Sequence, residues 1–381
     1  MTFLFQVGVE AKLWWVVVVV VLPALFIMGA EGHGQVPCYF IFGDSLADNG
    51  NNNLLETLAK VNYPPYGIDF PFGPTGRFSN GRTTVDVIAE VLGFDNFIPP
   101  FASVNGTDIL FGVNYASGSA GILNETGQQL GERIPLDMQL ENHRTIVLRL
   151  VEILGTELAA SWYLSKCLYT VGLGNNDYIN NYFLPQYYNT SRDYTLLQYT
   201  ELLIEQYTQQ IKTLHKYGAR KIALFGLGQI GCTPDAISTY GTNGSTCVEI
   251  MEEASLLFNS KLKLVVEQLN ANITDAKFIY INYYTIGADS SVLGFTNASA
   301  GCCPVASDGQ CIPDQVPCQN RTAYAFWDSF HPTEAVNVYI GLRSYSSLHP
   351  SDAYPFDIRN LVMLNQETGA AVSGKISIYQ E

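Results

Sequence analysis

Two short segments near opposite ends of the chain carry side chains that together can attack a carbonyl group. Ser45 follows an apolar run, 39–42, and the glycine that ends it. Near the other end, Asp328 lies three residues before His331. A hydroxyl nucleophile, an imidazole base and a carboxylate that orients the base are the groups that make a neutral serine reactive. These residue types predict acyl transfer through a serine.

The spacing places these groups at one edge of an α/β sheet. Residues 39–42 are all apolar, as expected for a buried parallel strand, so Ser45 falls on the turn at its carboxyl end. Ligands bind at that edge in open α/β sheets. A tight turn lets the carboxylate of Asp328 reach His331. The segment 43–47 lacks the second glycine of the G-x-S-x-G motif, so the α/β-hydrolase nucleophile elbow is not expected.

Each motif taken alone also has a purely structural interpretation. The residues Gly, Asp and Ser at 43–45 favour turns for reasons unrelated to catalysis. Gly118 lies in a run of small residues typical of a flexible loop, and Asn176 suits an Asx turn at the end of a strand. His331 precedes a proline and suits the start of a helix. The functional prediction therefore depends on the order of the blocks.

In that order, the blocks resemble the GDSL esterase/lipases of the SGNH hydrolase superfamily, in particular the plant type. The matching segments cover nearly the whole mature chain and are 42–46 with 48–53, 112–118, 174–177, and Trp327, Asp328, His331, Pro332, Thr333, Glu334 and Asn337. The resemblance implies that Ser45, Asp328 and His331 are catalytic. It also implies an oxyanion hole made of the backbone N–H groups of Ser45 and Gly118 and the side-chain amide of Asn176. Loss of one such donor typically costs about 2.7–4 kcal/mol of transition-state stabilisation.

The same resemblance implies a fold and an activity. The expected fold is a three-layer α/β/α structure with a central, mostly parallel five-stranded sheet, the flavodoxin-like SGNH hydrolase fold. The expected activity is cleavage of carboxylic esters, either acyl lipids or other acyl esters, through an acyl-enzyme on Ser45, without cofactor or metal. Two alternatives stay open: an acyltransferase of the same fold, as in cutin-type polyester assembly, and a catalytically silent binding or adhesion protein.

Hydrophobic periodicity agrees with an α/β fold. Strands are predicted at 38–42, 109–115, 168–173, 221–227 and 277–283, and helices at 83–92, 136–154, 194–217 and 249–269. Strands that alternate with helices indicate a parallel sheet covered on both faces. No linker or repeat divides the mature chain, so residues 31–381 are predicted to form a single domain. The longest irregular segment is 51–82.

The composition indicates a secreted protein. Residues 13–28 are apolar apart from one proline and follow a lysine, which predicts a signal peptide over 1–30. An uncleaved anchor is the alternative, although the run is short for a bilayer span. Seven N-x-[ST] tripeptides are glycosylation candidates: Asn105, Asn124, Asn189, Asn243, Asn272, Asn297 and Asn320.

The eight cysteines also suit an oxidising compartment. Six fall in loops, without the paired spacing of a zinc site, and are disulfide candidates: Cys232, Cys247, Cys302, Cys303, Cys311 and Cys318. We predict three disulfides among them, of which only the pair Cys232 and Cys247 can be named. Cys38 and Cys167 each begin an apolar run, and the strand order implied by the resemblance makes these runs neighbours. We predict two buried free thiols, because neighbouring parallel strands seldom offer disulfide geometry; a Cys38–Cys167 disulfide is the alternative.

The formal net charge of −15 argues against nucleic acid or an anionic membrane surface as a partner. The expected partner is a small-molecule or lipid ester, with no stable membrane insertion after signal cleavage. Substrate choice depends on pocket shape, and the loops 51–82, 180–193 and 282–318 show no pattern that identifies the acyl chain or the alcohol. The sequence leaves the oligomeric state open.

Overall fold

The computed structural model describes residues 34–364, so the predicted signal peptide over 1–30 lies outside the described residues. A central sheet has the strand order β1-β2-β3-β4-β7, in which the first four strands are parallel and the last is antiparallel. The strands are β1 (Tyr39–Gly43), β2 (Leu168–Gly172), β3 (Lys221–Phe225), β4 (Lys277–Ile281) and β7 (Ala353–Tyr354). A separate pair consists of β5 (Asn297–Gly301) and β6 (Tyr324–Phe326). The predicted mostly parallel five-stranded sheet is confirmed.

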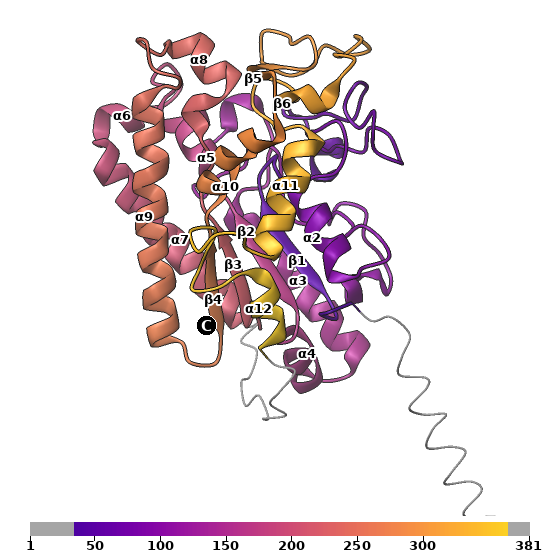
Figure 1. Ribbon diagram of the computed structural model, residues 1–381. Coiled ribbons are helices and arrows are strands. Elements are labelled where there is room, and N and C mark those ends of the chain that lie inside the picture. The colour runs from indigo at the N-terminus through magenta and orange to yellow at the C-terminus, as the bar shows by residue number, and fades with distance from the viewer. Residues whose placement is uncertain (1–33, 365–381) are drawn as a thin grey trace, which may run out of the picture.

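Helices pack on both faces of this sheet, which gives three layers (Figure 1). One face is covered by α3 (Leu136–Leu154), α4 (Glu157–Leu164), α7 (Leu196–Lys216) and α9 (Glu249–Asn272). The other is covered by α2 (Thr84–Leu92), α10 (Tyr283–Asp289), α11 (Glu334–Tyr345) and α12 (Ile358–Met363). Shorter helices are α5 (Asn175–Asp177), α6 (Thr190–Asp193) and α8 (Pro234–Tyr240). The short η turns are Asn51–Leu54, Asp108–Phe111, Gln128–Leu130, Tyr178–Tyr182, Ile230–Cys232, Ser290–Leu293 and Arg321–Ala323.

The strand residues alternate between the two cores. In β1, Phe40 and Phe42 join the core under α3, while Tyr39 and Ile41 join the core under α2. Successive side chains of a strand point to opposite faces, so a strand buried on both sides must be apolar throughout. This is why the apolar runs predicted four of the five strands, and why the helical periodicity predicted α2, α3, α7 and α9.

The prediction of a strand at 109–115 was wrong. Residues Asp108–Phe111 form a 3₁₀ turn, and Asn114 alone in this segment makes isolated parallel bridges, one with Ile41 and one with Pro100. Gly112, at a φ of 116°, approaches the backbone of Tyr39 so closely that a Cβ would collide with it. The apolar residues are buried here by close packing against the outer edge of β1. The fifth strand of the sheet is β7, at the opposite edge.

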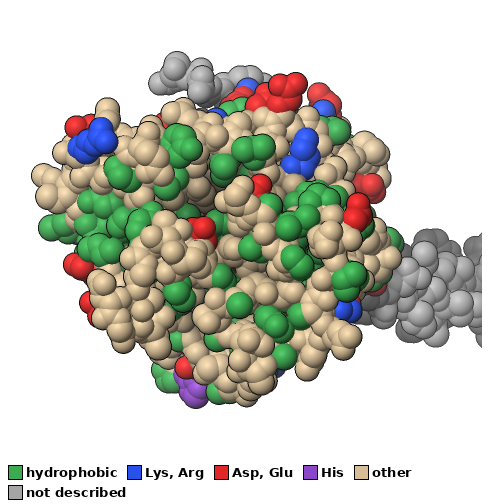
Figure 2. Space-filling model, turned by 90° about the horizontal axis from the view of Figure 1, so that it is seen from above, with side chains coloured by type: hydrophobic (Ala, Val, Ile, Leu, Met, Phe, Trp, Pro, Cys, Tyr) green, Lys and Arg blue, Asp and Glu red, His purple; other side chains and the backbone are tan. Residues whose placement is uncertain are grey.

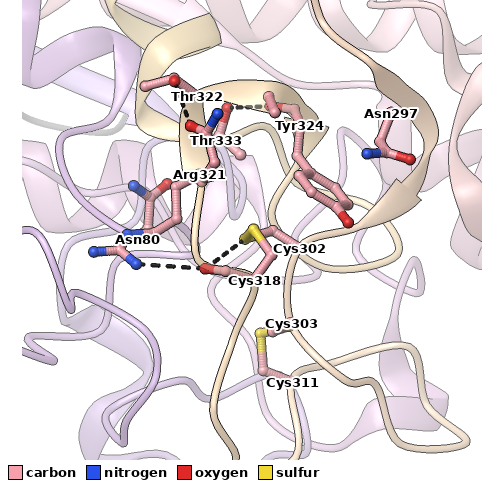
Figure 3. The surroundings of a disulfide bond; sticks show 12 residues. Asn80, Asn297, Cys302, Cys303, Cys311, Cys318, Arg321, Thr322, Tyr324 and Thr333 are labelled. Atoms are coloured by element: carbon pink, nitrogen blue, oxygen red, sulfur yellow. Dashed lines mark hydrogen bonds between the residues drawn. A yellow bond between two sulfur atoms is a disulfide. The ribbon is translucent and has the colours of Figure 1, made fainter.

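Four disulfides lie within the described residues: Cys38–Cys167, Cys232–Cys247, Cys302–Cys318 and Cys303–Cys311. The named pair and the prediction of three disulfides among the six loop cysteines are confirmed; Figure 3 shows the last two side by side. The prediction of two free thiols was wrong. β1 and β2 pair with Tyr39 opposite Leu168, so the preceding Cys38 and Cys167 face each other with a Cα separation of 4.8 Å.

Six of the seven glycosylation candidates are exposed, and Asn297, at the start of β5, is half-buried. An attached glycan is bulky and must extend into solvent. The exposed positions are therefore sterically suited to glycans.

None of the helices within residues 34–364 is both long and apolar enough to cross a membrane.

His143 is a packing residue of α3 whose imidazole is fully buried. Its Nδ1 lies 3.0 Å from the hydroxyl of Tyr115, and its ring contacts Phe40 and Phe42. Burial lowers the pKa of His143 from 6.5 to about 3. The folded protein therefore keeps this ring neutral, whereas the unfolded chain protonates it below about pH 6.5. Stability should fall as the pH decreases from 6.5 toward 3.

We expect the free energy of unfolding of the wild type to fall by about 2.5 kcal/mol more than that of His143→Leu between pH 7 and pH 4.5. Urea denaturation of both proteins at the two pH values measures this difference. The variant also loses the contact with Tyr115, but this loss lowers its stability equally at both pH values and cancels in the comparison. Equal pH dependence in the two proteins would show that His143 is protonated in the folded state.

Candidate active site

The three predicted catalytic residues lie together at the carboxyl edge of the sheet. Ser45 is half-buried in the turn after β1, where the carboxylate of Asp44 accepts the N–H of Leu46 at 3.0 Å. The Oγ of Ser45 lies 2.8 Å from Nε2 of His331. The Nδ1 of His331 lies 2.8 and 3.0 Å from the two carboxylate oxygens of Asp328. Because a carboxylate only accepts, Nδ1 carries the proton and Nε2 is free to accept from Ser45.

The turn that carries Asp328 and His331 is held by the carboxylate itself. One oxygen of Asp328 accepts the backbone N–H groups of Phe330 and His331, both at 2.8 Å. The backbone N–H of Trp327 donates to the carbonyl of His331 at 2.7 Å and closes the turn. Asp328 is fully buried and His331 is 7% exposed. This turn sets the position of the imidazole before any substrate arrives.

Tyr66 was missed by the sequence analysis. Its hydroxyl donates to the second oxygen of Asp328 at 2.7 Å. Tyr66 lies in the irregular segment 51–82, and no motif there links it to a residue more than 250 positions away. The only signal was its place in the longest irregular segment of the chain.

The three predicted oxyanion donors differ in whether their N–H groups already have a hydrogen-bond partner. The backbone N–H of Ser45 has no hydrogen-bond partner among the described residues. The amide nitrogen of Asn176 donates to the carbonyl of Ala120 at 3.0 Å, and its oxygen accepts from Asn180 at 2.7 Å. The amide is therefore oriented, and its nitrogen has a second hydrogen for a ligand. Asn176 lines the pocket described below.

The N–H of Gly118 donates to the carboxylate of Asp48 at 2.9 Å. Asp48 is buried and also accepts the N–H groups of Gly50 and Asn51, both at 2.8 Å, and burial raises its pKa to about 6. The next residue, Ser119, lines the pocket at a φ of 62°, and its N–H has no partner within residues 34–364. The structure therefore directs the N–H of Gly118 away from the pocket that Ser119 faces.

The asparagine run after Ser45 fastens the first block to the second. The amide of Asn51 donates to the carbonyls of Asn114 and Ala116 at 2.9 and 2.7 Å. The amide of Asn52 donates to the carbonyl of Gly118 at 3.1 Å. These side chains bind backbone oxygens of the irregular segment 114–118, of which the carbonyl of Asn114 also accepts the N–H of Phe101 at 2.9 Å. The resemblance of residues 48–53 to the first block of the GDSL esterase/lipases therefore has a structural cause.

Ser45, His331 and Asn176 open into a cavity of about 800 Å³. Its apolar lining comes from separate elements and includes Ile179, Ile230, Ile237, Phe295, Val336 and Ile340. The lining residues include Asp44 and Asp308 but no Lys or Arg. Figure 2 views the end of the molecule where the lining elements α8, β5 and β6 lie; few Lys or Arg side chains appear on this face, and Asp and Glu side chains are scattered among hydrophobic ones. The cavity is of the size and character that bind small ligands.

Comparisons with known proteins agree with this geometry. Residues 39–343 match the family described as GDSL-like Lipase/Acylhydrolase. One GDSL esterase/lipase of Arabidopsis thaliana is 52% identical over 358 residues, which cover 92% of this chain and 98% of the relative. Another from the same plant is 53% identical over 342 residues, which cover 88% of this chain and 95% of the relative.

The solved structure of phospholipase A1 from Streptomyces albidoflavus matches this chain with a TM-score of 0.36 and 12% sequence identity. The match covers 79% of this chain and 94% of that one. This similarity is too weak to say anything about the substrate of this protein. The curated relatives and the family match are decisive. The chain belongs to the GDSL-like lipase/acylhydrolase family, and it is a carboxylic ester hydrolase.

Proposed function

We propose that this protein is a secreted hydrolase that cleaves neutral acyl esters through an acyl-enzyme on Ser45. The observation that carries the proposal is the continuous hydrogen-bonded chain from Ser45 through His331 to Asp328, with both links at 2.8 Å. Such a chain is what a serine needs to act as a nucleophile near neutral pH. The family assignment supports ester chemistry, and the geometry supports the covalent intermediate.

In the proposed mechanism, Nε2 of His331 takes the proton of Ser45 as Oγ bonds to the ester carbonyl carbon. The resulting imidazolium is stabilised by Asp328 and returns the proton to the alkoxide, so the alcohol leaves and the acyl-serine remains. Water then gives a proton to His331 and attacks the acyl carbon. The acid leaves as Ser45 regains its proton.

The negative oxygen of each tetrahedral intermediate requires N–H donors. We assign this role to the backbone N–H of Ser45 and the side-chain amide of Asn176. The third donor is the N–H of Ser119 in place of that of Gly118, because Gly118 is engaged by Asp48 whereas Ser119 lines the pocket. The proposed oxyanion hole therefore has three donors, as predicted from the sequence, with Ser119 in the place of Gly118.

Secretion is supported by two observations on the described residues. Four disulfides are formed, which is typical of proteins that fold in an oxidising compartment. Six of the seven glycosylation candidates are exposed. Glycopeptide mapping of protein secreted from plant cells, together with sequencing of its amino terminus, tests this part of the proposal. An intact residue 1 and bare asparagines would contradict it.

A fluorophosphonate probe tests the acyl-enzyme. We expect mass spectrometry to find the phosphonyl group on Ser45 alone, and pretreatment to abolish ester cleavage. Incubating the active enzyme with an ester and an acceptor alcohol then separates hydrolysis from acyl transfer: free acid as the main product supports the hydrolase, whereas a new ester as the main product supports the transferase. Full activity without labelling of Ser45 would exclude the proposed intermediate.

The charge of the cavity predicts selectivity for neutral acyl groups. A carboxylate on the acyl chain would lose its hydration in a cavity that is lined by Asp44 and Asp308 and has no lysine or arginine in its lining. We expect kcat/KM for mono(p-nitrophenyl) succinate to be about tenfold or more below that for p-nitrophenyl pentanoate. Absorbance assays at low and high salt measure the ratio. Equal values for the two esters would show that the acyl chain does not enter this cavity.

A further inference from the structure

The catalytic carboxylate receives one hydrogen bond from outside the four sequence blocks. We propose that Tyr66 is a positioning residue that tunes Asp328, and through it the basicity of His331, by donating its phenolic proton to the carboxylate. The inference rests on the proposed acyl-enzyme chemistry and assigns a part in it to the irregular segment 51–82. Tyr66 does not touch the reacting atoms and acts only through Asp328.

The contact is short and isolated from solvent. The hydroxyl of Tyr66 lies 2.7 Å from Oδ2 of Asp328, the oxygen that also faces Nδ1 of His331 at 2.8 Å. Tyr66 is 1% exposed and Asp328 is fully buried. A hydrogen bond to an ionised group is stronger than one between neutral groups, and low local dielectric strengthens it further. Tyr66 and His331 therefore share the charge on one oxygen.

The direction of the tyrosine proton is set by a second contact. The backbone N–H of Cys311 donates to the hydroxyl oxygen of Tyr66 at 3.1 Å. An oxygen that accepts from this N–H is left with its own proton to donate, and the ionised carboxylate of Asp328 accepts it. Burial and the nearby negative charge of Asp328 raise the pKa of Tyr66 well above its usual value. Tyr66 therefore remains a donor throughout the working pH range.

The disulfide loop and an aromatic cluster hold Tyr66 in place. Cys311 is bonded to Cys303, and its carbonyl accepts the hydroxyl of Tyr63 at 3.0 Å. The rings of Tyr63 and Phe78 pack edge-on against Tyr66, with centroid separations of 5.5 and 6.4 Å. Phe78 also contacts the ring of His331, with a centroid separation of 4.8 Å. Contacts on several sides therefore fix the position of the Tyr66 ring and hydroxyl.

Removing this hydrogen bond has a defined chemical consequence. Without Tyr66, the negative charge of Asp328 is held by fewer donors and attracts the imidazolium of His331 more strongly. His331 then stays protonated to higher pH, and a protonated imidazole cannot accept the proton of Ser45. The acidic limb of the plot of kcat/KM against pH must therefore move to higher pH. The substrate cavity is unchanged, so KM should change little.

Tyr66→Phe tests the proposal, with Tyr63→Phe as the matched control. Both variants lose a phenolic hydroxyl that contacts Cys311, but only Tyr66 also contacts Asp328. For Tyr66→Phe we expect the acidic limb to rise by roughly half a pH unit, so that kcat/KM falls about threefold at pH values below the limb, while KM stays within about twofold of the wild type. For Tyr63→Phe we expect the wild-type limb. Matching pH profiles in the two variants would overturn the proposal.

A second substitution keeps the phenolic ring and should shift the acidic limb in the opposite direction. Placing 3-fluorotyrosine at position 66 makes the phenol a stronger donor, and the acidic limb should then move to lower pH. An unchanged or raised limb would contradict the role of Tyr66 even if Tyr66→Phe fails to fold. These outcomes are distinct from failure of the proposed function, because fluorophosphonate labelling of Ser45 in the wild type tests that function independently.

Discussion

Replacing Ser45 with alanine should reduce kcat for a p-nitrophenyl ester by on the order of 10⁵-fold while the protein stays folded. The variant loses the oxygen that forms the acyl bond, and the structure places no second nucleophile within hydrogen-bonding distance of Nε2 of His331 among the described residues. The half-buried side chain is small, so its loss should leave the thermal unfolding temperature nearly unchanged. Stopped assays at high enzyme concentration measure the residual rate.

Two further variants make this result specific. His331→Ala should lose a similar factor, and the double variant with Ser45→Ala should lose little more, because the two residues act as one unit. Ser260→Ala is the matched control, since Ser260 is an exposed residue of α9 outside the cavity lining. Its rate should equal that of the wild type. Wild-type turnover by folded Ser45→Ala would exclude the acyl-enzyme on this residue.

Replacing Arg77 with methionine should lower the free energy of unfolding by about 3–5 kcal/mol. The guanidinium of Arg77 pairs with both oxygens of Asp86 at 2.7 and 2.8 Å, and both residues are buried. Its guanidinium also lies 4.1 Å from the ring centre of Phe70. Although burial raises the pKa of Asp86, the charge and hydrogen bonds of Arg77 lower it below the usual value. The variant leaves an uncompensated charge in the core.

Urea denaturation at pH 7 measures this loss, with Arg82→Met as the control. Arg82 lies in the same segment and pairs with Glu90 and Glu334, but its side chain is 34% exposed, so its loss should cost about 1 kcal/mol or less. The contribution of the Arg77 pair should be present above about pH 4 and disappear as Asp86 is protonated at lower pH. Equal losses in the two variants at pH 7 would show that burial adds nothing to the Arg77 pair.

The amino-acid sequence by itself predicted four strands of the central sheet, the long helices and a candidate catalytic set, because these features have local signatures. Apolar runs and helical periodicity identified β1 and the long helices, since burial on one or both faces restricts residue type at a fixed period. The turn after β1 and the three-residue spacing of Asp328 and His331 are also local. Residue types and spacing therefore suggested Ser45, Asp328 and His331 as a set, the order of the blocks gave that set its predicted role, and the Cys232–Cys247 disulfide was named from its loop.

Other features were decided by contacts between distant segments. Whether 109–115 became a strand depended on how closely Gly112 packs against β1. Cys38 and Cys167 formed a disulfide because the register of β1 and β2 placed them opposite each other. The hydrogen bonds of Gly118 with Asp48, and of Tyr66 with Asp328, join residues 70 and 262 positions apart. Local pattern carries no information on such pairings, because the chain brings these groups together only when the layers pack.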